Sequence, residues 1–253
     1  MFAHYIALGD SMSIDLYPAL DAGEVDVAVA LEWNAGAGNV APLGAAALFY
    51  SNADDRYPDF QGQDLATLHP GITYTNLADD GATIGDVFGS QLSLLDESDD
   101  DTLLTLSVGG NDLLSAFSNR PAPVLLQGIV RDIGDGLEFL AEALRRVRPN
   151  STLLITTVYD PSDGTRKVPG VFDGAGPLPL ESLNDFNARI KQVVSRLQRA
   201  AVADVHTHFR GHGVTATEAE RWYWKRSLIE PNAAGASEIR RLWLDALESV
   251  TEN

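Results

Sequence analysis

Five short apolar segments, each followed by turn residues and a helical pattern, constrain the fold of this chain most strongly. They are His4–Leu8, Ile72–Leu77, Thr102–Val108, Leu153–Tyr159 and Ala203–Phe209. Their nearly continuous apolar character is typical of strands buried on both faces, and the helical stretches supply the crossovers that parallel strands require. The sequence therefore predicts an α/β fold, a three-layer α/β/α sandwich around a doubly wound, parallel, five-stranded sheet.

Helical periodicity is clearest in four stretches. They are Thr83–Leu95, Val124–Val147, Leu180–Ala200 and Ala234–Leu247. Residues 17–70 form a long connection between the first two strands, with a helical segment of its own near Pro42–Tyr50. Because no linker or repeat divides the 253 residues, we expect a single domain over residues 1–253 with a long insertion at about 17–70.

The charge balance excludes one class of partner. The formal net charge is −18, from 36 acidic and 18 basic residues. A field of this sign repels phosphate backbones, so we do not expect nucleic acid as a partner. Two explanations of the acidic composition stay open: a high-salt host, in which salt screens the self-repulsion, and a solvated acidic face in an ordinary host.

The sequence also argues against a membrane span and a metal centre. No run of about 18 apolar residues is present. The chain enters its first strand pattern without a basic leader or cleavage site, so we expect a cytoplasmic location. The absence of cysteine excludes thiolate ligands, and no ligand spacing indicates a metal. We expect no cofactor, and the sequence does not indicate an oligomeric state.

Glycine-rich polar motifs follow the first three expected strands. They are Gly9-Asp10-Ser11, Gly81-Ala82-Thr83 and Gly109-Gly110-Asn111-Asp112. Ligands of open parallel sheets bind beyond the carboxyl ends of the strands, so a hydroxyl, an approachable glycine N–H and a side-chain amide meet in one crevice. These groups suit a nucleophile with additional donors for an oxyanion. Each motif taken alone is also typical of a turn or a helix cap.

In order and spacing these motifs resemble the SGNH hydrolase family, the GDSL-like lipases and acylhydrolases, whose blocks read G-D-S, an isolated Gly, G-x-N-D and D-x-x-H. The resemblance spans nearly the whole chain and implies a flavodoxin-like SGNH fold that hydrolyses small-molecule carboxylic esters, as an esterase, acylhydrolase or deacetylase. It implies that Ser11 is the nucleophile and that the oxyanion hole consists of the Ser11 N–H, the Gly81 N–H and the Asn111 amide. It also implies that Asp10 and Asp112 support the turns that present these groups.

The fourth block departs from the family pattern. Residues 227–235 read Ser-Leu-Ile-Glu-Pro-Asn-Ala-Ala-Gly, where the family has D-x-x-H-P-N-x-x-G. Ser227 therefore stands in the place of the Asp, and Glu230 stands in the place of the His. A serine hydroxyl is a poor nucleophile at neutral pH unless another group takes its proton, so a different base is needed.

Among the histidines, one is placed to serve as that base. The five are His4, His69, His206, His208 and His212. The first two lie at the amino ends of expected strands, with His4 about 20 Å from Ser11. The next two fall on one face of the fifth expected strand, where a packed histidine is the more common case. His212 directly follows that strand between two glycines, at the same edge of the sheet as Ser11.

Three hypotheses about the site therefore stay open. In the first, His212 is the general base and Glu230 orients it, as in a Ser–His–Glu triad. In the second, Glu230 itself accepts the Ser11 proton. In the third, catalysis is lost and the chain is an SGNH-fold protein that binds a polar or carbohydrate ligand, with His212 an exposed loop residue.

Overall fold

A five-stranded parallel sheet lies at the centre of the computed structural model, which describes residues 1–25, 40–171 and 176–251. Its strands are β1 (His4–Gly9), β2 (Thr73–Asn76), β3 (Thr102–Ser107), β4 (Thr152–Thr156) and β5 (Ala200–Ala203). They are ordered β2-β1-β3-β4-β5, and each neighbouring pair is parallel. This order is the flavodoxin-like one, so the expected fold class is confirmed.

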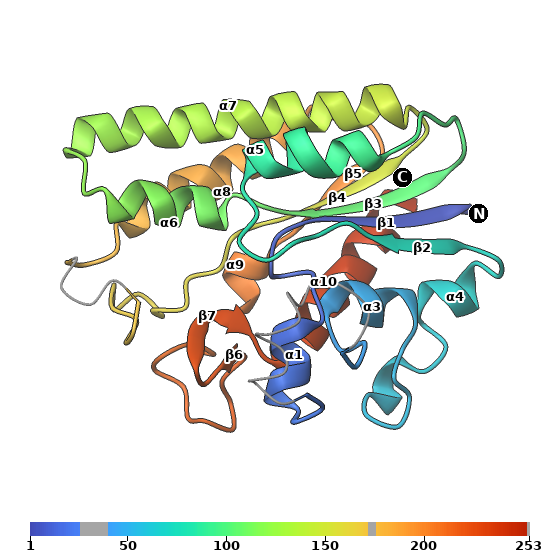
Figure 1. Cartoon of the computed structure of the whole chain (residues 1–253), viewed down its shortest axis with the longest axis horizontal. Helices are drawn as coiled ribbons and strands as arrows, with labels where there is room; N and C mark the ends of the chain where they lie inside the picture. Colours follow the sequence, from blue (N-terminus) through green and yellow to red (C-terminus); the bar gives the residue numbers. More distant parts are fainter. Residues whose placement is uncertain (26–39, 172–175, 252–253) are drawn as a thin grey trace.

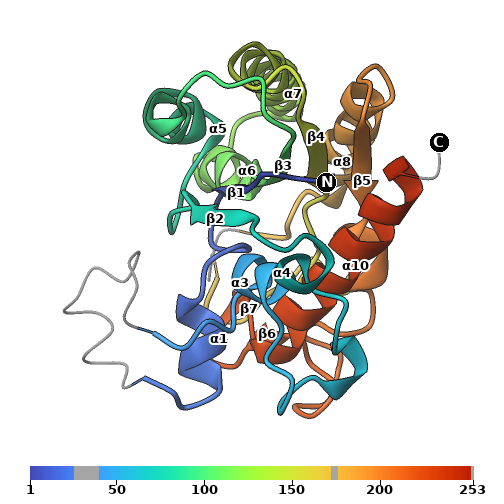
Figure 2. The ribbon, with the colours of Figure 1, turned by 90° about the vertical axis from the view of Figure 1, so that its right-hand side faces the viewer.

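Helices cover both faces of the sheet (Figures 1 and 2). One face carries α5 (Ile84–Asp86) with the turns η2 (Val87–Gln91) and η3 (Leu92–Leu94), and also α6 (Gly110–Ser118), α7 (Pro123–Val147) and α8 (Leu180–Val194). The other face carries α1 (Leu16–Asp21), α3 (Ala45–Tyr50), η1 (Pro58–Phe60), α4 (Leu65–Leu68), α9 (Val205–His208) and α10 (Ala233–Thr251). The chain therefore forms three layers with the sheet in the middle.

The sheet separates two hydrophobic cores. All six residues of β3 are buried, and successive side chains of a strand point to opposite faces. Leu104 belongs to the core beneath α7 and α8, whereas Leu103 belongs to the core against α10. This burial on both faces is the reason that the strand sequences are almost uniformly apolar.

The expected fifth strand, Ala203–Phe209, was wrong in its position. The strand ends at Ala203, and α9 begins two residues later. The Asp204 side chain caps this helix by accepting a hydrogen bond from the Thr207 N–H. Val205 and Phe209 are both fully buried, and their spacing of four residues suits one face of a helix. His212 consequently does not follow a strand directly, because α9 and a further turn lie between it and β5.

The fourth block lies in a separate two-stranded hairpin at the carboxyl edge of the sheet (Figure 1). Strand β6 (Tyr223–Trp224) pairs antiparallel with β7 (Ser227–Pro231), and α10 starts directly after β7. Of the insertion at 17–70, α1, η1, α3 and α4 are described, while residues 26–39 lie outside the described ranges. Within these ranges, none of the helices combines the length and the apolar character that crossing a bilayer requires.

Candidate active site

The turn after β1 presents Ser11. Gly9 has a φ of +118°, and a Cβ at this position would lie 1.9 Å from the Ser107 carbonyl oxygen, so only glycine fits. The Gln91 side chain clamps the same residue, because its Oε1 accepts from the Gly9 N–H and its Nε2 donates to the Gly9 carbonyl, both at 2.8 Å. The Asp10 N–H donates to the Ser107 carbonyl at 2.8 Å. Ser11 is therefore held on a turn that is fixed from two sides.

The Asp10 carboxyl lies beneath this turn and is only 3% exposed. Its Oδ1 accepts a hydrogen bond from the Met12 N–H at 3.1 Å. Burial raises the pKa of Asp10 to about 8, a hydrogen bond from Met12 opposes the rise, and the nearby charge of Glu230 adds to it. Asp10 is therefore mainly protonated at pH 7.

The motifs after β2 and β3 are tied to each other. The Asn111 Nδ2 donates to the Ala82 carbonyl at 3.1 Å, and Asp112 Oδ2 accepts from the Ile84 N–H at 3.1 Å. Gly81 precedes Ala82 with a φ of +74°, and it is exposed. It lines a neighbouring hollow between residues 76 and 94, whereas Asn111 lines the pocket of Ser11.

Glu230 lies in the same pocket as Ser11. Its side chain is buried in β7, with 8% of the residue exposed. Burial raises the pKa of Glu230 to about 7, a hydrogen bond from the Ser11 side chain opposes the rise, and the negative charge of Asp80 adds to it. Within the described chain, the Oε2 atom has no hydrogen-bond partner. A buried carboxyl with a pKa near neutrality thus lies beside the candidate nucleophile.

Ser11 and Glu230 line one pocket with a cavity volume of about 80 Å³. Its polar lining residues are Asp10, Ser11, Asn111, Asp160 and Glu230, and its other lining residues are mainly aliphatic or aromatic. As far as the chain is described, no Lys, Arg or His lines this pocket. Nor do the described residues include a group of three or more His, Asp or Glu arranged to hold a metal ion.

His212 lies elsewhere. Its ring stacks on Trp222 with centroids 3.5 Å apart and planes 2° apart, and its Nδ1 is 2.7 Å from the Glu220 carbonyl oxygen. Its contacts in the described structure include neither Ser11 nor Glu230. The expectation rested on a strand that would end just before His212, and this premise fails because β5 ends at Ala203.

The retained part of the fourth block fixes the hairpin. Asn232 donates through Nδ2 to the Arg221 carbonyl at 2.7 Å and accepts through Oδ1 from the Gly235 N–H at 2.8 Å. A Cβ on Gly235 would lie 2.2 Å from the Trp222 carbonyl oxygen. Pro-Asn-x-x-Gly therefore attaches β6 to the start of α10 and positions Glu230. Ser227 pairs with Trp224 at the other end of β7.

Sequence reasoning missed three residues that support the site. Besides Gln91, Asn187 of α8 clamps Val158 just past β4, accepting from its N–H and donating to its carbonyl, both at 2.8 Å. Tyr159 donates to the Ile229 carbonyl at 2.6 Å, next to Glu230. An amide on the sheet-facing stripe of a helix is the signal that was available, because a buried amide requires partners.

Comparison with known proteins matches most of the chain to one family model. A family model described as "GDSL-like Lipase/Acylhydrolase family" matches residues 33–237, which begin after Ser11. The comparison with curated proteins gave no match.

Solved structures share the fold at low sequence identity. An extracellular lipase from Streptomyces rimosus has a TM-score of 0.56 and 19% identity, with 98% of this chain and 99% of that chain covered. Phospholipase A1 from Streptomyces albidoflavus NA297 has a TM-score of 0.56 and 20% identity, with 98% of this chain and 99% of that chain covered. A catalytic mutant of an acetylxylan esterase from Geobacillus stearothermophilus has a TM-score of 0.55 and 13% identity, with 97% of this chain and 94% of that chain covered.

Proposed function

Because this chain belongs to the GDSL-like lipase/acylhydrolase family, we propose that it hydrolyses carboxylic esters, with Ser11 as the nucleophile and Glu230 as the general base. The observation that carries this proposal is that one pocket is lined both by Ser11 and by a buried carboxyl, Glu230, whose pKa is about 7. A general base is most effective when its pKa lies near the working pH. Burial thus gives Glu230 the basicity that an exposed carboxylate lacks.

The first half of the reaction forms an acyl-enzyme. Glu230 takes the proton from the Ser11 hydroxyl as Oγ attacks the ester carbonyl carbon, and the carbonyl oxygen becomes an oxyanion. We assign the stabilisation of this oxyanion to the Ser11 N–H, the Asn111 amide and the Gly81 N–H. Asn111 lines the pocket of Ser11, and its hydrogen bond to Ala82 joins the start of α6 to the loop of Gly81, which lines the neighbouring hollow. Protonated Glu230 then gives its proton to the leaving alcohol oxygen.

The second half releases the acyl group. Glu230 takes a proton from a water molecule, whose oxygen attacks the acyl carbon, and the bond to Oγ breaks as the proton returns to Ser11. The carboxylic acid then leaves. Because Oε2 of Glu230 has no partner in the described protein, it is available to the alcohol oxygen and to the water.

Neutral Asp10 completes this charge arrangement. An ionised carboxylate beside Ser11 would repel both the Glu230 base and the oxyanion. The pKa of Asp10, raised by burial to about 8, keeps it protonated while Glu230 ionises. Asp10 is the more deeply buried of the two, and the negative charge of ionised Glu230 raises the pKa of Asp10 further, so Asp10 stays protonated when Glu230 ionises.

A second candidate function is ligand binding without catalysis. It is favoured by two observations: no imidazole lines the pocket in the part of the chain that is described, and Ser227 replaces the family's Asp. The relay through His212 stays a prediction that requires the loop after α9 to move. Variants at Ser11, Glu230 and His212 separate these three readings.

The deciding experiment is the hydrolysis of p-nitrophenyl butyrate at pH 8, at low and high salt. We expect Ser11→Ala to show only the uncatalysed rate and Glu230→Gln to lose about 10²- to 10⁴-fold in kcat/KM, the usual contribution of a general base. We expect His212→Ala to keep the wild-type rate. Equal losses in the His212 and Glu230 variants would establish the relay. A wild type no faster than Ser11→Ala, over a range of acyl and acetylated carbohydrate esters, would establish the binding function.

A further inference from the structure

Two hollows of the structure meet at one wall. The Ser11 pocket and a second hollow of about 470 Å³ share three lining residues, Phe117, Leu178 and Pro179. Phe117 belongs to the last turn of α6, and Pro179 is the N-cap residue of α8. The Leu178 N–H donates to the Arg166 carbonyl at 2.8 Å. The wall thus consists of one aromatic side chain and the segment that leads into α8.

The Ser11 side of this wall is short and apolar. Aliphatic side chains from α6 and the start of α8, among them Leu113, Leu114 and Leu183, line it together with Val158 and Ile229. One water-sized group needs about 10–15 Å³ of cavity volume. The pocket of about 80 Å³ therefore holds about six such groups. This space suits a straight acyl chain of about four to six carbons.

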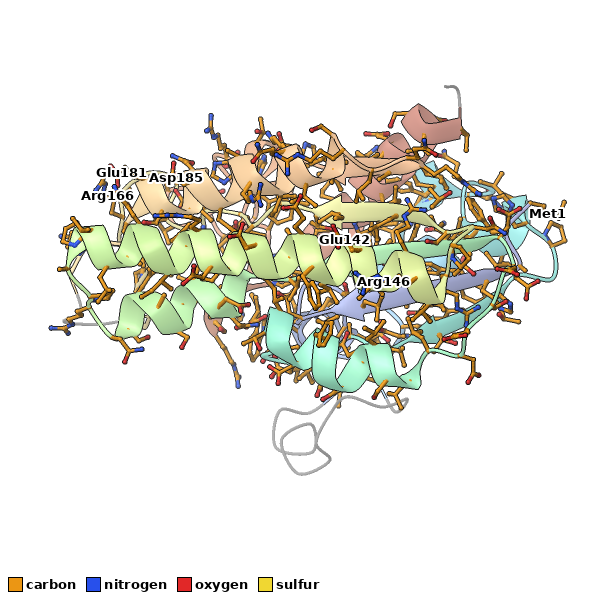
Figure 3. The ribbon with its side chains drawn as sticks, turned by 90° about the horizontal axis from the view of Figure 1, so that it is seen from above. Met1, Glu142, Arg146, Arg166, Glu181 and Asp185 are labelled. Carbon is orange, nitrogen blue, oxygen red and sulfur yellow. The ribbon has the colours of Figure 1, made fainter. Side chains whose placement is uncertain are left out.

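The far side of the wall is larger and ends in charge. Its apolar lining includes Pro121 and Leu126, and its charged lining includes Arg166, Glu181 and Asp185. Figure 3 shows these three charged side chains together at the end of the molecule opposite Met1. Arg166 and Glu181 form an ion pair there. The hollow therefore offers both apolar and ionic lining beyond the wall.

We propose that Phe117, together with Leu178 and Pro179, sets the length of the acyl chain that the enzyme accepts. This inference rests on the proposed ester hydrolysis at Ser11. A chain that starts at Ser11 and exceeds the pocket meets the wall, whereas removal of the Phe117 ring joins the pocket to the second hollow. Longer aliphatic chains then extend into that hollow and bury further methylenes.

The test is a series of p-nitrophenyl esters from acetate to dodecanoate, hydrolysed by the wild type and by Phe117→Ala. We expect the wild-type kcat/KM to be highest at about four to six carbons, as the pocket volume requires. Each methylene that becomes buried contributes about fourfold, so Phe117→Ala should raise the ratio of the decanoate rate to the butyrate rate at least tenfold. An unchanged ratio in a folded Phe117→Ala protein would overturn the proposal.

Two matched variants control for side-chain volume and for the loss of an aromatic ring. Leu114 lines the Ser11 pocket but not the second hollow, so Leu114→Phe should shift the preference toward acetate. Phe139 is an aromatic residue of α7 that is 51% exposed and lines neither hollow, so Phe139→Ala should keep the wild-type profile. A lengthened profile in Phe139→Ala would attribute the effect to general loosening and not to the wall.

Binding of neutral straight-chain 1-alkanols separates this proposal from the catalytic one. In the Ser11→Ala background, the gain in affinity per methylene should stop at about hexanol and should continue to decanol once Phe117→Ala is added. If Ser11→Ala hydrolyses esters as fast as the wild type, the proposed function is refuted. The alkanol series still shows whether Phe117 limits the length of the pocket, because it measures binding and not hydrolysis. Equal alkanol profiles with and without the Phe117 ring would refute the wall.

Discussion

At the residue scale, a carboxylate in the position of an imidazole reverses the charge change of the base. A histidine that takes the serine proton becomes positive and pairs with the oxyanion, whereas Glu230 changes from negative to neutral. The site therefore keeps one negative charge throughout the proposed reaction, first on Glu230 and then on the oxyanion. The N–H donors around Ser11 and Asn111 must stabilise that charge without help from an imidazolium.

The pH dependence of catalysis follows from the two buried carboxyls. Because Glu230 must be ionised, kcat/KM should rise through an apparent pKa near 7 and should be about tenfold lower at pH 6 than on the plateau. It should fall again above about pH 8, where Asp10 ionises. Stopped assays of butyrate ester hydrolysis between pH 5 and pH 9.5 test this profile.

Asp10→Asn is the matched control for the high-pH limb. The amide keeps an oxygen that can accept from the Met12 N–H, but it does not ionise. We expect this variant to retain activity above pH 8. The rise of kcat/KM through an apparent pKa near 7 should be the same as in the wild type. A wild-type profile that is already flat at pH 5 would be incompatible with Glu230 as the base.

Glu230 should also make the protein less stable at alkaline pH. Its pKa is raised from 4.5 to about 7, so between these values the folded state keeps a proton that the unfolded state has lost. The contribution of Glu230 to stability is therefore greatest below pH 4.5 and falls as the pH rises through 7, by about 3 kcal/mol in total. Glu230→Gln, which carries no charge, should exceed the wild type in free energy of unfolding at pH 8.

Urea unfolding at pH 5 and pH 8 measures this effect. The difference between Glu230→Gln and the wild type should grow toward the higher pH. The exposed Glu97 provides the control, since Glu97→Gln removes a carboxyl that is not buried. A Glu230→Gln protein that is less stable at pH 8 would show that the carboxylate has stabilising partners in solution.

At the element scale, helices hold the ends of the strands through bidentate amides. Gln91 of the turn η2 clamps Gly9 after β1, and Asn187 of α8 clamps Val158 after β4. Both amides are buried, so water cannot replace them as hydrogen-bond partners of the backbone groups of Gly9 and Val158. The same contacts that satisfy the backbone also fix the turn that carries Ser11 and the position of Val158, which lines the Ser11 pocket.

Gln91→Leu should therefore reduce both stability and rate. The change leaves the Gly9 N–H and carbonyl without their partners in a buried position, which costs about 2–4 kcal/mol of unfolding free energy. The turn of Ser11 loses one of its two fixed sides, so kcat should fall even where the protein remains folded. Thermal unfolding and esterase assays measure the two effects, with the exposed Gln198→Leu as control. A variant with normal stability and normal kcat would refute the role of the clamp.

The sequence predicted the parts of the fold that depend on local pattern and on the parallel sheet. Four strands and the long helices were evident from periodicity, and Ser11 and Asn111 could be brought to one edge because each follows a strand. The fifth strand was misplaced because Val205 and Phe209 fit a strand and a helix equally well until the Asp204 cap decides. The predicted position of His212 was wrong for the same reason, because it assumed a strand that ends shortly before this residue.

The placement of Glu230 in the pocket of Ser11 depends on tertiary structure. It arises because the β6–β7 hairpin folds over the carboxyl edge of the sheet, held there by Asn232 and Gly235. No local sequence pattern predicts this placement. From the sequence, Glu230 as the base that accepts the Ser11 proton was therefore only one of several hypotheses. The pKa values likewise follow from burial, which periodicity does not reveal for an isolated hairpin.

At the scale of the whole molecule, the charge of −18 and the chemistry of the pocket favour the same class of substrate. An acidic molecule repels anions over its surface, and salt at physiological concentration screens this field beyond about 8 Å. The pocket beside Ser11 is largely apolar. Neutral esters with aliphatic acyl groups enter such a site without an electrostatic penalty, whereas substrates with a free carboxylate are disfavoured.

The lining of the Ser11 pocket also bears on how a catalytic cycle ends. Its lining residues with a carboxyl group are Asp10, Asp160 and Glu230, and no basic side chain lines it in the described chain. Ester hydrolysis converts a neutral acyl group into a fatty acid that ionises at neutral pH. Under the proposed function, the product acquires the same sign of charge as its surroundings at the moment it forms. Electrostatic repulsion would then speed product departure and weaken inhibition by accumulated fatty acid.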